Sequence, residues 1–318
     1  MTQKYAKDQP AGFINRIERV AIVGAGGTVG KYITQELLQT GQHTVTALTR
    51  AGSKNTLPAG VRTVTVDYDD ESTLVAALQN QQFLIITLSV TAPKDTQSKL
   101  IQAAAKAGVP YVMPNCYGVD ITNEKLRKES LAGDPVRQAC AEIEETGVSV
   151  WVALVCGFWY EFSLATGPEW FGFDFKEKKV TFYDDGSTKI NVSTWEQCGR
   201  AVAAFLKFKE LPEDENDSSP TRDMFESWKR ITGDKDEDWT IEYEPTAERY
   251  QRGIERMQKG DRRGFAQALY ARVFYPNGGG DYESRRGLDN AVLGLPKEDL
   301  DERTKRAKEM FESGYSYF

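Results

Sequence analysis

Residues 20–30 read Val-Ala-Ile-Val-Gly-Ala-Gly-Gly-Thr-Val-Gly, an apolar run that ends in glycines spaced three residues apart. Such a run predicts a buried strand followed by a tight turn. Gly24 suits the sharp exit from the strand, Gly27 lets a phosphate approach backbone N–H groups, and Gly30 lets a helix lie close on the sheet. The stretch therefore predicts a strand, a turn and a helix that bind the pyrophosphate of a dinucleotide.

The residues after the turn provide the context that this motif needs. Val29, Ile33 and Leu37 recur at helical spacing, so a helix follows the glycines directly. A glycine pattern alone is weak evidence, but one between a strand and a helix favours a nucleotide site over a turn that binds nothing. The turn residues that we expect to contact the cofactor are Gly24, Gly26, Gly27, Thr28 and Val29.

The end of the next strand, residues 43–49, indicates which dinucleotide is bound. An NAD site places Asp or Glu there to hold the ribose hydroxyls, but this strand ends in Arg50, with Lys54 four residues on. Between Gly30 and Asp67 the one acid is Glu36, inside the helix. Because two cations can pair a 2′-phosphate, we predict NADP(H) as cofactor. The alternative, that both are ordinary surface charges, stays open.

Strand and helix signals alternate to about residue 158, which predicts an α/β fold with a Rossmann-type, doubly wound parallel sheet. The composition then changes, with aromatic residues crowding into 158–173. We expect an N-terminal extension at 1–18, an NADP-binding Rossmann domain at 19–158 and a smaller C-terminal substrate lobe at 159–318. Further strands are expected at 61–66, 83–88, 111–113 and 148–155, and helices in the lobe at 194–207, 224–231 and, on its surface, 298–312.

Ligands of such sheets bind at the carboxyl ends of the strands. Asp67, Ser89 and Asn115 each follow a predicted strand, so we assign them to the cofactor site. Asp67 suits the adenine amino group, although a helix N-cap is an equal alternative. The expected substrate-binding residues are Cys156, Phe158, Trp159, Tyr160 and Trp170. The alternative is that these aromatic residues form only the core of the lobe.

Composition excludes several other classes of protein. The net charge is −7 with scattered basic residues, so neither nucleic acid nor an anionic membrane is an expected partner. No apolar run approaches the roughly 20 residues that span a bilayer, and residues 1–18 lack the apolar centre of a signal peptide, so we expect a cytoplasmic protein. Four separated cysteines and a single histidine, His43, predict no metal site and argue against a Ser-His-Asp hydrolase.

Three segments beyond the glycine turn and Arg50 carry a family resemblance: residues 111–120, 158–164 and 181–204. With them, the chain resembles the NmrA-like, isoflavone reductase-like branch of atypical short-chain dehydrogenases, and 181–204 is similar to its fungal members. The resemblance implies an NADP(H)-binding Rossmann domain with a small lobe over the nicotinamide. It also implies reduction of phenylpropanoid-derived substrates, a role in secondary metabolism, and a lysine at the start of the helix before the sixth strand.

That lysine is missing from this chain, because its position holds Val136, with Arg137 beside it. The Tyr-x-x-x-Lys pair of ordinary short-chain dehydrogenases is absent too. Reduction of a carbonyl or an activated alkene needs a proton donor, and we predict Tyr117, with Lys125 or Lys128 lowering the pKa of its phenol. Arg137 is a candidate for stabilising an oxyanion. The alternative is that Tyr117 packs in the interior and the lysines are solvated.

Two functions follow. The first is an NADPH-dependent reductase of a small aromatic or conjugated carbonyl or alkene substrate, with Tyr117 and Lys125 as the catalytic residues. The second is a catalytically silent NADP(H)-sensing regulator of NmrA type that acts through a protein partner. The missing lysine favours the sensor, whereas the aromatic segment favours the enzyme.

Overall fold

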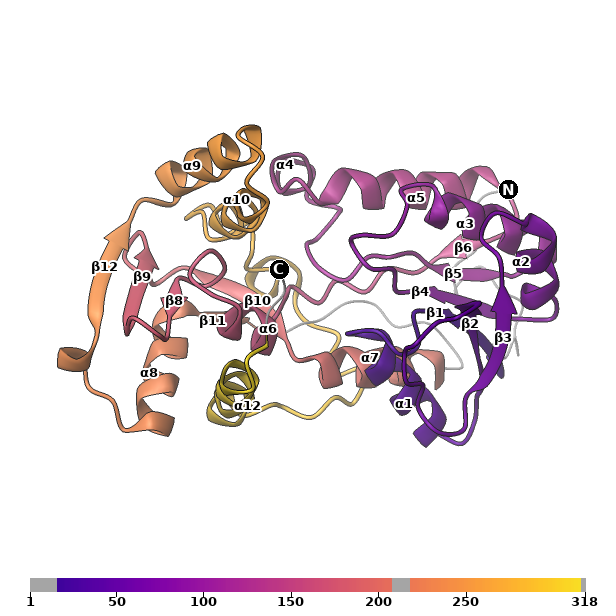
Figure 1. Ribbon diagram of the computed structural model, residues 1–318, viewed down its shortest axis with the longest axis horizontal. Coiled ribbons are helices and arrows are strands. Elements are labelled where there is room, and N and C mark those ends of the chain that lie inside the picture. Colours follow the sequence, from indigo (N-terminus) through magenta and orange to yellow (C-terminus); the bar gives the residue numbers. More distant parts are fainter. Residues whose placement is uncertain (1–15, 208–217, 316–318) are drawn as a thin grey trace.

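The computed structural model describes residues 16–207 and 218–315, and its first half is built on a six-stranded parallel sheet (Figure 1). The strand order is β3-β2-β1-β4-β5-β6, which is that of a doubly wound Rossmann sheet. The predicted fold class is therefore confirmed. The strands are β1 (Arg19–Val23), β2 (Thr44–Arg50), β3 (Arg62–Val66), β4 (Phe83–Ile86), β5 (Tyr111–Met113) and β6 (Val150–Trp151).

Both faces of this sheet are covered, because alternate side chains of each strand point to opposite faces. Ala21 and Val23 pack into a cluster with three helices, whereas Val20 and Ile22 face the other way. The three helices are α2 (Glu71–Leu78), α3 (Thr96–Ala107) and α5 (Gly133–Glu145). The other face carries α1 (Gly30–Gln39) and α7 (Trp195–Lys207).

Helix α7 comes from the second half of the chain and returns to the nucleotide-binding sheet, where Figure 1 shows it beside α1. The ring of Trp195 stacks on Tyr32 of α1, with 6.1 Å between the ring centroids. The same apolar cluster runs from Ile33 in α1 to Phe225 in the second half. We therefore propose that the boundary at residue 158 separates two lobes that share one core.

The second half contains two small sheets and several helices that surround this core. One sheet has the order β11-β10-β7 and the other β12-β9-β8. Their strands are β7 (Phe158–Trp159), β8 (Phe173–Asp174), β9 (Lys179–Tyr183), β10 (Lys189–Ser193), β11 (Ser218–Pro220) and β12 (Thr240–Glu244). The helices are α6 (Tyr160–Ala165), α8 (Thr221–Thr232), α9 (Thr246–Gln258), α10 (Arg263–Val273), α11 (Glu283–Arg286) and α12 (Leu300–Glu312).

Helices α7 and α8 lie where the sequence predicts them, but the expected surface helix is only half correct. In α12, Thr304 and Ala307 are fully buried, and Thr304 shares a hydrogen bond of 2.7 Å with the hydroxyl of Tyr160. Helix α12 packs against α6 and α8 because its small residues fit against them. One face of this charged helix is thus part of the lobe.

Two expected absences concern membranes and metals. Within residues 16–207 and 218–315, no helix is long and apolar enough to cross a bilayer. Over the same residues, no group of histidine, cysteine and acidic side chains is arranged to hold a metal ion.

Candidate functional site

The glycine turn packs tightly between β1, β4 and α1. Gly24 has a φ of +81°, and a Cβ there would lie 2.0 Å from the carbonyl oxygen of Thr87. A Cβ on Gly30 would lie 2.1 Å from the carbonyl oxygen of Gly24. Thr87 follows β4 and donates its hydroxyl to the carbonyl of Val23 at 2.7 Å. Only glycine at these two positions lets the helix approach the sheet this closely.

The start of α1 fits an anion. Its N-cap residue, Val29, provides no capping side chain, and the first turn contains no acid. The positive end of the helix dipole is therefore left without a partner from its own side chains, as a pyrophosphate site requires. Val29 itself is 4 % exposed and packs in the core, so it can contribute only backbone to a cofactor.

The predicted 2′-phosphate cations lie at the same sheet edge. Arg50 is the last residue of β2 and Lys54 lies in the following loop, and both are exposed. Neither has an ion-pair partner in the part of the chain that the structure describes. The loop also reaches the glycine turn, because a Cβ on Gly26 would lie 2.7 Å from the carbonyl oxygen of Thr56. The two cations are thus held beside the turn and stay available.

The other predicted cofactor residues follow β3, β4 and β5. Asp67 accepts a hydrogen bond from the backbone N–H of Asp69 at 2.9 Å, and the N-cap of α2 is Asp70 rather than Asp67. The capping alternative for Asp67 is therefore wrong. Ser89 is exposed and shares a hydrogen bond with the hydroxyl of Thr91 at 2.9 Å.

Asn115 connects the ends of β4 and β5. Its Oδ1 accepts from the backbone N–H of Leu88 and its Nδ2 donates to the carbonyl of the same residue, both at 3.1 Å. The backbone N–H of Asn115 donates to Gln97 at 2.7 Å. With both ends of its amide used, the side chain of Asn115 shapes the loop after β4, so we assign it to positioning rather than to direct contact.

Most of the predicted substrate-binding aromatic residues lie in the core instead. Phe158 stacks on Tyr270 with 4.0 Å between centroids, and Tyr160 is fully buried beneath α12. Trp170 is 4 % exposed and packs edge-on against Phe162. The alternative that these rings form the core of the lobe is therefore the correct one for Phe158, Tyr160 and Trp170. Their apolar rings are held by other aromatic rings on several sides.

Cys156 and Trp159 have different surroundings from these core rings. Cys156 is buried, while Trp159 is only partly covered and lies edge-on to Trp195, with 6.1 Å between centroids. Trp195 in turn stacks on Tyr32, the third residue of α1. These rings lie where the two lobes meet, next to the helix whose start is expected to bind phosphate.

Four buried polar atoms of the residues on these segments have no hydrogen-bond partner. They are the hydroxyl of Tyr117, the indole nitrogens of Trp159 and Trp195, and Oε2 of Glu161, all buried and all unpartnered among the described residues. We call these four residues and Tyr32 the lobe junction. Buried polar groups without partners are rare in native proteins, and each calls for an explanation such as a catalytic role or a bound group. Sequence reasoning missed Tyr32, Glu161 and Trp195; the acid within the apolar segment 158–164 was the available signal.

The structure does not support the prediction that a lysine lowers the pKa of the Tyr117 phenol. Burial, together with the thiols of Cys116, Cys156 and Cys198, raises the pKa of the Tyr117 phenol well above its usual value. Lys125 is exposed on α4 (Glu124–Glu129). Among the residues that the structure describes, no lysine therefore lowers the pKa of the phenol, which stays a neutral hydrogen-bond donor.

The remaining predicted cations near the cleft are used elsewhere. Lys128 pairs with Glu124 at 2.5 Å on the surface of α4. Arg137 points along its own helix to Glu144, with 3.6 Å between the charged atoms, so it is not placed to stabilise an oxyanion. Val136, at the position of the family lysine, packs beside Cys116 and Cys140 in a small apolar cluster.

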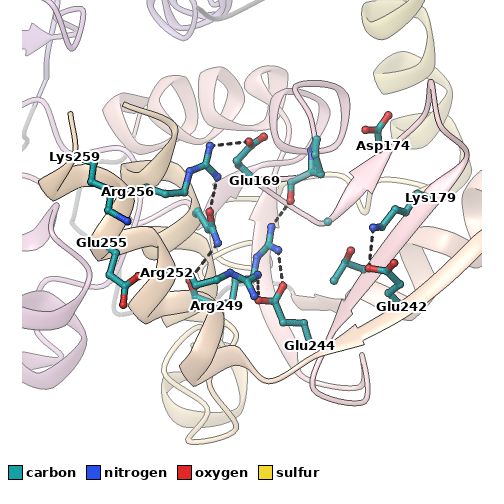
Figure 2. Close-up of a pocket in the computed structure, with 14 residues that line it drawn as sticks. Glu169, Asp174, Lys179, Glu242, Glu244, Arg249, Arg252, Glu255, Arg256 and Lys259 are labelled. Carbon is teal, nitrogen blue, oxygen red and sulfur yellow. Dashed lines mark hydrogen bonds and ion pairs between the residues drawn. The ribbon is translucent and has the colours of Figure 1, made fainter. Parts of the chain in front are cut away.

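A cavity of about 420 Å³ lies in the C-terminal lobe between β9, β12 and α9 (Figure 2). Arg249 and Arg252 both reach Glu244, with 2.8 Å for the first pair. Arg256 pairs with Glu169 at 3.3 Å and with Asp261 at 2.8 Å. These arginines and acids largely neutralise one another, which indicates a network that holds α9 on the sheet.

A Rossmann sheet, a glycine turn that opens an uncapped helix and cations after β2 define a dinucleotide-binding protein. Residues 24–152 match the family model described as NAD(P)H-binding. The chain is also similar to "Oxidoreductase aprR" of Aspergillus flavus, at 28 % identity over 294 residues, covering 89 % of this chain and 96 % of that protein.

Solved structures share the fold over nearly the whole chain. Isoflavone reductase matches with a TM-score of 0.70 at 19 % identity, covering 91 % of this chain and 99 % of its own. AtPrR2, solved with NADP+ and (+)-pinoresinol, matches with a TM-score of 0.71 at 18 % identity, covering 91 % and 98 %. Leucoanthocyanidin reductase of Vitis vinifera, solved with NADPH, matches with a TM-score of 0.70 at 14 % identity, covering 91 % and 99 %. The resemblance to the isoflavone reductase-like, NmrA-like proteins is thus confirmed in the fold and in the NAD(P)H-binding domain.

Proposed function

We propose that this protein is an NADPH-dependent reductase of a small aromatic or conjugated carbonyl or alkene substrate. The observation that carries the proposal is the lobe junction, where unpartnered buried polar atoms and indole rings meet beside the first turn of α1. An apolar site with a few polar groups suits a flat ligand that bears one or two oxygens. Two similar structures contain NADP+ or NADPH, and one of these also contains an aromatic ligand, pinoresinol.

The residues present fit the proposed cofactor. The uncapped start of α1 would hold the pyrophosphate, and Arg50 with Lys54 would pair the 2′-phosphate. Asp67 and Ser89 border the same edge of the sheet. When bound, NADPH supplies a hydride. The protein then has to orient the substrate, exclude water and provide a proton.

The lobe junction supplies the first two of these needs. Trp159, Trp195 and Tyr32 offer ring faces and edges against which an aromatic substrate can pack. The Tyr117 hydroxyl is a buried donor without a partner, so it can bind a substrate oxygen. Because its pKa is raised, it provides a hydrogen bond and not the transferred proton.

One observation favours a cofactor sensor as the second candidate. Val136 fills the position where the resemblance predicts a lysine and lies in an apolar cluster, so this position brings no acid or base to the site. A regulator would need only the cofactor site and a surface that responds to it.

Deuteride transfer separates the two functions. NADPH labelled with deuterium at C4 is incubated with the protein and a panel of quinones, aromatic enones and benzylic ethers. Mass spectrometry of the products then detects the label. A reductase places deuterium in at least one product, and the same assay with labelled NADH gives less. Tight NADPH binding without label in any product would favour the sensor.

A further inference from the structure

Glu161 is a buried acid that the fold does not explain. It is the second residue of α6, a helix whose six residues are all buried, and it is 4 % exposed. Its Oε2 has no hydrogen-bond partner in the described chain. An ionised carboxylate in such a place loses its hydration without compensation, so a buried unpaired acid holds its proton.

The neighbouring charges strengthen this conclusion. Glu196 of α7 pairs with Arg306 of α12 at 3.2 Å, and Glu298 pairs with Arg200 at 2.6 Å. Glu298 also pairs with Arg303 at 3.1 Å. The arginines around the junction therefore form ion pairs with Glu196 and Glu298 and not with Glu161.

Burial raises the pKa of Glu161 to about 8, and the charges of Glu196 and Glu298 act in the same direction. Arg306 and the backbone N–H of Glu161 offset only part of this effect. Tyr32, which faces Glu161 from α1, is itself uncharged at neutral pH, because its pKa is raised to about 12. On the α7 side, the hydrogen bond with the thiol of Cys156, together with burial, raises the pKa of Cys198 well above its usual value. Glu161 is thus protonated and neutral at pH 7, and it can act as a proton donor.

We propose that Glu161, the unpaired acid of the lobe junction, is the proton donor of the reductase. This proposal rests on the proposed function. As the hydride from NADPH forms a new C–H bond on the substrate, NADPH becomes NADP+ and the substrate gains the electron pair. The O–H bond of Glu161 breaks and its proton goes to the substrate oxygen, or to the carbon of an enolate. Glu161 is left as a carboxylate and takes a proton from water before the next turnover.

The position of Glu161 suits this role. It follows Trp159 by two residues, and Trp159 contacts Trp195, which stacks on α1. The carboxyl is covered by protein, so a substrate reaches it when a neighbouring ring moves. Trp159 is partly exposed, as Tyr32 and Tyr117 are, and we expect it to be the ring that moves because it lies two residues from Glu161 on the same segment of chain. Enzymes are known to keep a carboxylic acid neutral at pH 7 by placing it in an apolar site, so that it can serve as a donor.

The first test measures the proton directly and does not need turnover. Infrared spectra of wild type and Glu161→Gln are compared for the C=O stretch of a protonated carboxylic acid. We expect a band in the wild type that titrates away near pH 8 and is missing from the variant. Absence of the band would overturn the assignment, even if the wild type transfers deuteride and the reductase function stands.

The second test uses the pH dependence of kcat/KM. The wild type should lose activity as the pH rises through about 8, and Glu161→Gln should lose about 10²- to 10⁴-fold at pH 7, the usual value of general acid catalysis. Glu196→Gln is the matched control. It removes a nearby negative charge and frees Arg306, so the alkaline limb should move to lower pH while the variant keeps its activity at low pH. If the alkaline limb of Glu196→Gln lies at the same pH as that of the wild type, the result contradicts the proposal.

Failure of the proton-donor assignment and failure of the reductase function give different results. An acid band in a wild type that transfers no deuteride would overturn the reductase and, with it, the donor role. If Glu161→Gln fails to fold, the shift of the alkaline limb of the kcat/KM profile in Glu196→Gln still tests the donor role of Glu161. Normal kcat/KM in a folded Glu161→Gln would show that the proton comes from elsewhere.

Discussion

Replacing Arg50 by alanine should weaken NADPH binding and leave NADH binding unchanged. A hydrogen bond to a charged group contributes about 1.5 to 3 kcal/mol. Arg50 is exposed, so water screens the pair and the lower part of that range applies. At about 1.4 kcal/mol per tenfold change, we expect the Kd for NADPH to rise about 10- to 30-fold. Titration calorimetry or quenching of protein fluorescence measures both dissociation constants.

Arg62→Ala is the matched control. Arg62 is also exposed and lies on the adjacent strand, but it pairs in register with Thr46, whereas Arg50 pairs with Val66. Four residues of strand, about 13 Å, separate it from the edge where the cofactor is expected. Its loss should change neither Kd. Equal affinities of the wild type for NADPH and NADH, or equal effects of the two substitutions, would refute the assignment of the 2′-phosphate site to Arg50.

Three further changes test other parts of the structure. Gly30→Ala forces a Cβ toward the carbonyl of Gly24, so urea unfolding should show a loss of about 1 to 3 kcal/mol and NADPH binding should fall; unchanged values would contradict the close packing. Tyr117→Phe should lower kcat/KM about tenfold with the alkaline limb unmoved, since it removes a hydrogen bond and not the proton donor. Burial lowers the pKa of His43, so the free energy of unfolding should fall as the pH drops below about 6.5, and urea series at several pH values should lose this slope in His43→Gln.

The sign of the Glu161 effect on stability is opposite to that of His43. The pKa of Glu161 is raised in the folded state, from 4.5 to about 8. The folded protein therefore binds the extra proton between these values, and its stability is lost as the pH rises through about 8. We expect Glu161→Gln to become more stable than the wild type as the pH increases. Parallel pH dependences of the two proteins would contradict a buried neutral acid.

The nucleotide-binding half could be predicted from the sequence because its signals are local. The strand, the turn and the helix at residues 20–37 are neighbours in the chain, and the positive φ of Gly24 and the contact of Gly30 with Gly24 arise within that stretch, although Thr56 and Thr87 also approach its glycines. The carboxyl ends of parallel strands then collect the later residues at one edge. Even so, β6 covers only Val150–Trp151 of the expected 148–155, because regular pairing with β5 ends there and is followed by an isolated parallel bridge between Leu154 and Tyr117.

The substrate side could not be predicted in the same way. The consecutive aromatic residues at 158–160 look alike in the sequence, yet Phe158 and Tyr160 are in the core while Trp159 faces the lobe junction. What separates them is the return of α7 onto α1, a contact between segments more than 150 residues apart. Trp195 reaches Tyr32 only through this return. Local pattern contains no information on such a pairing, so the junction had to be found from the structure.

The missing lysine and the buried acid belong to one argument. A reductase needs a proton source near the reacting atoms, and the start of α5, where the resemblance to isoflavone reductase-like proteins predicts a lysine, holds Val136 among apolar side chains. Tyr117 retains its proton too firmly to serve. Glu161 is buried, unpaired and neutral at the same junction, at a cost in stability that a sensor has no reason to carry. The position of this acid therefore favours an enzyme whose proton source lies on α6 instead of at the start of α5, and the infrared band of Glu161 tests that assignment before a substrate is known.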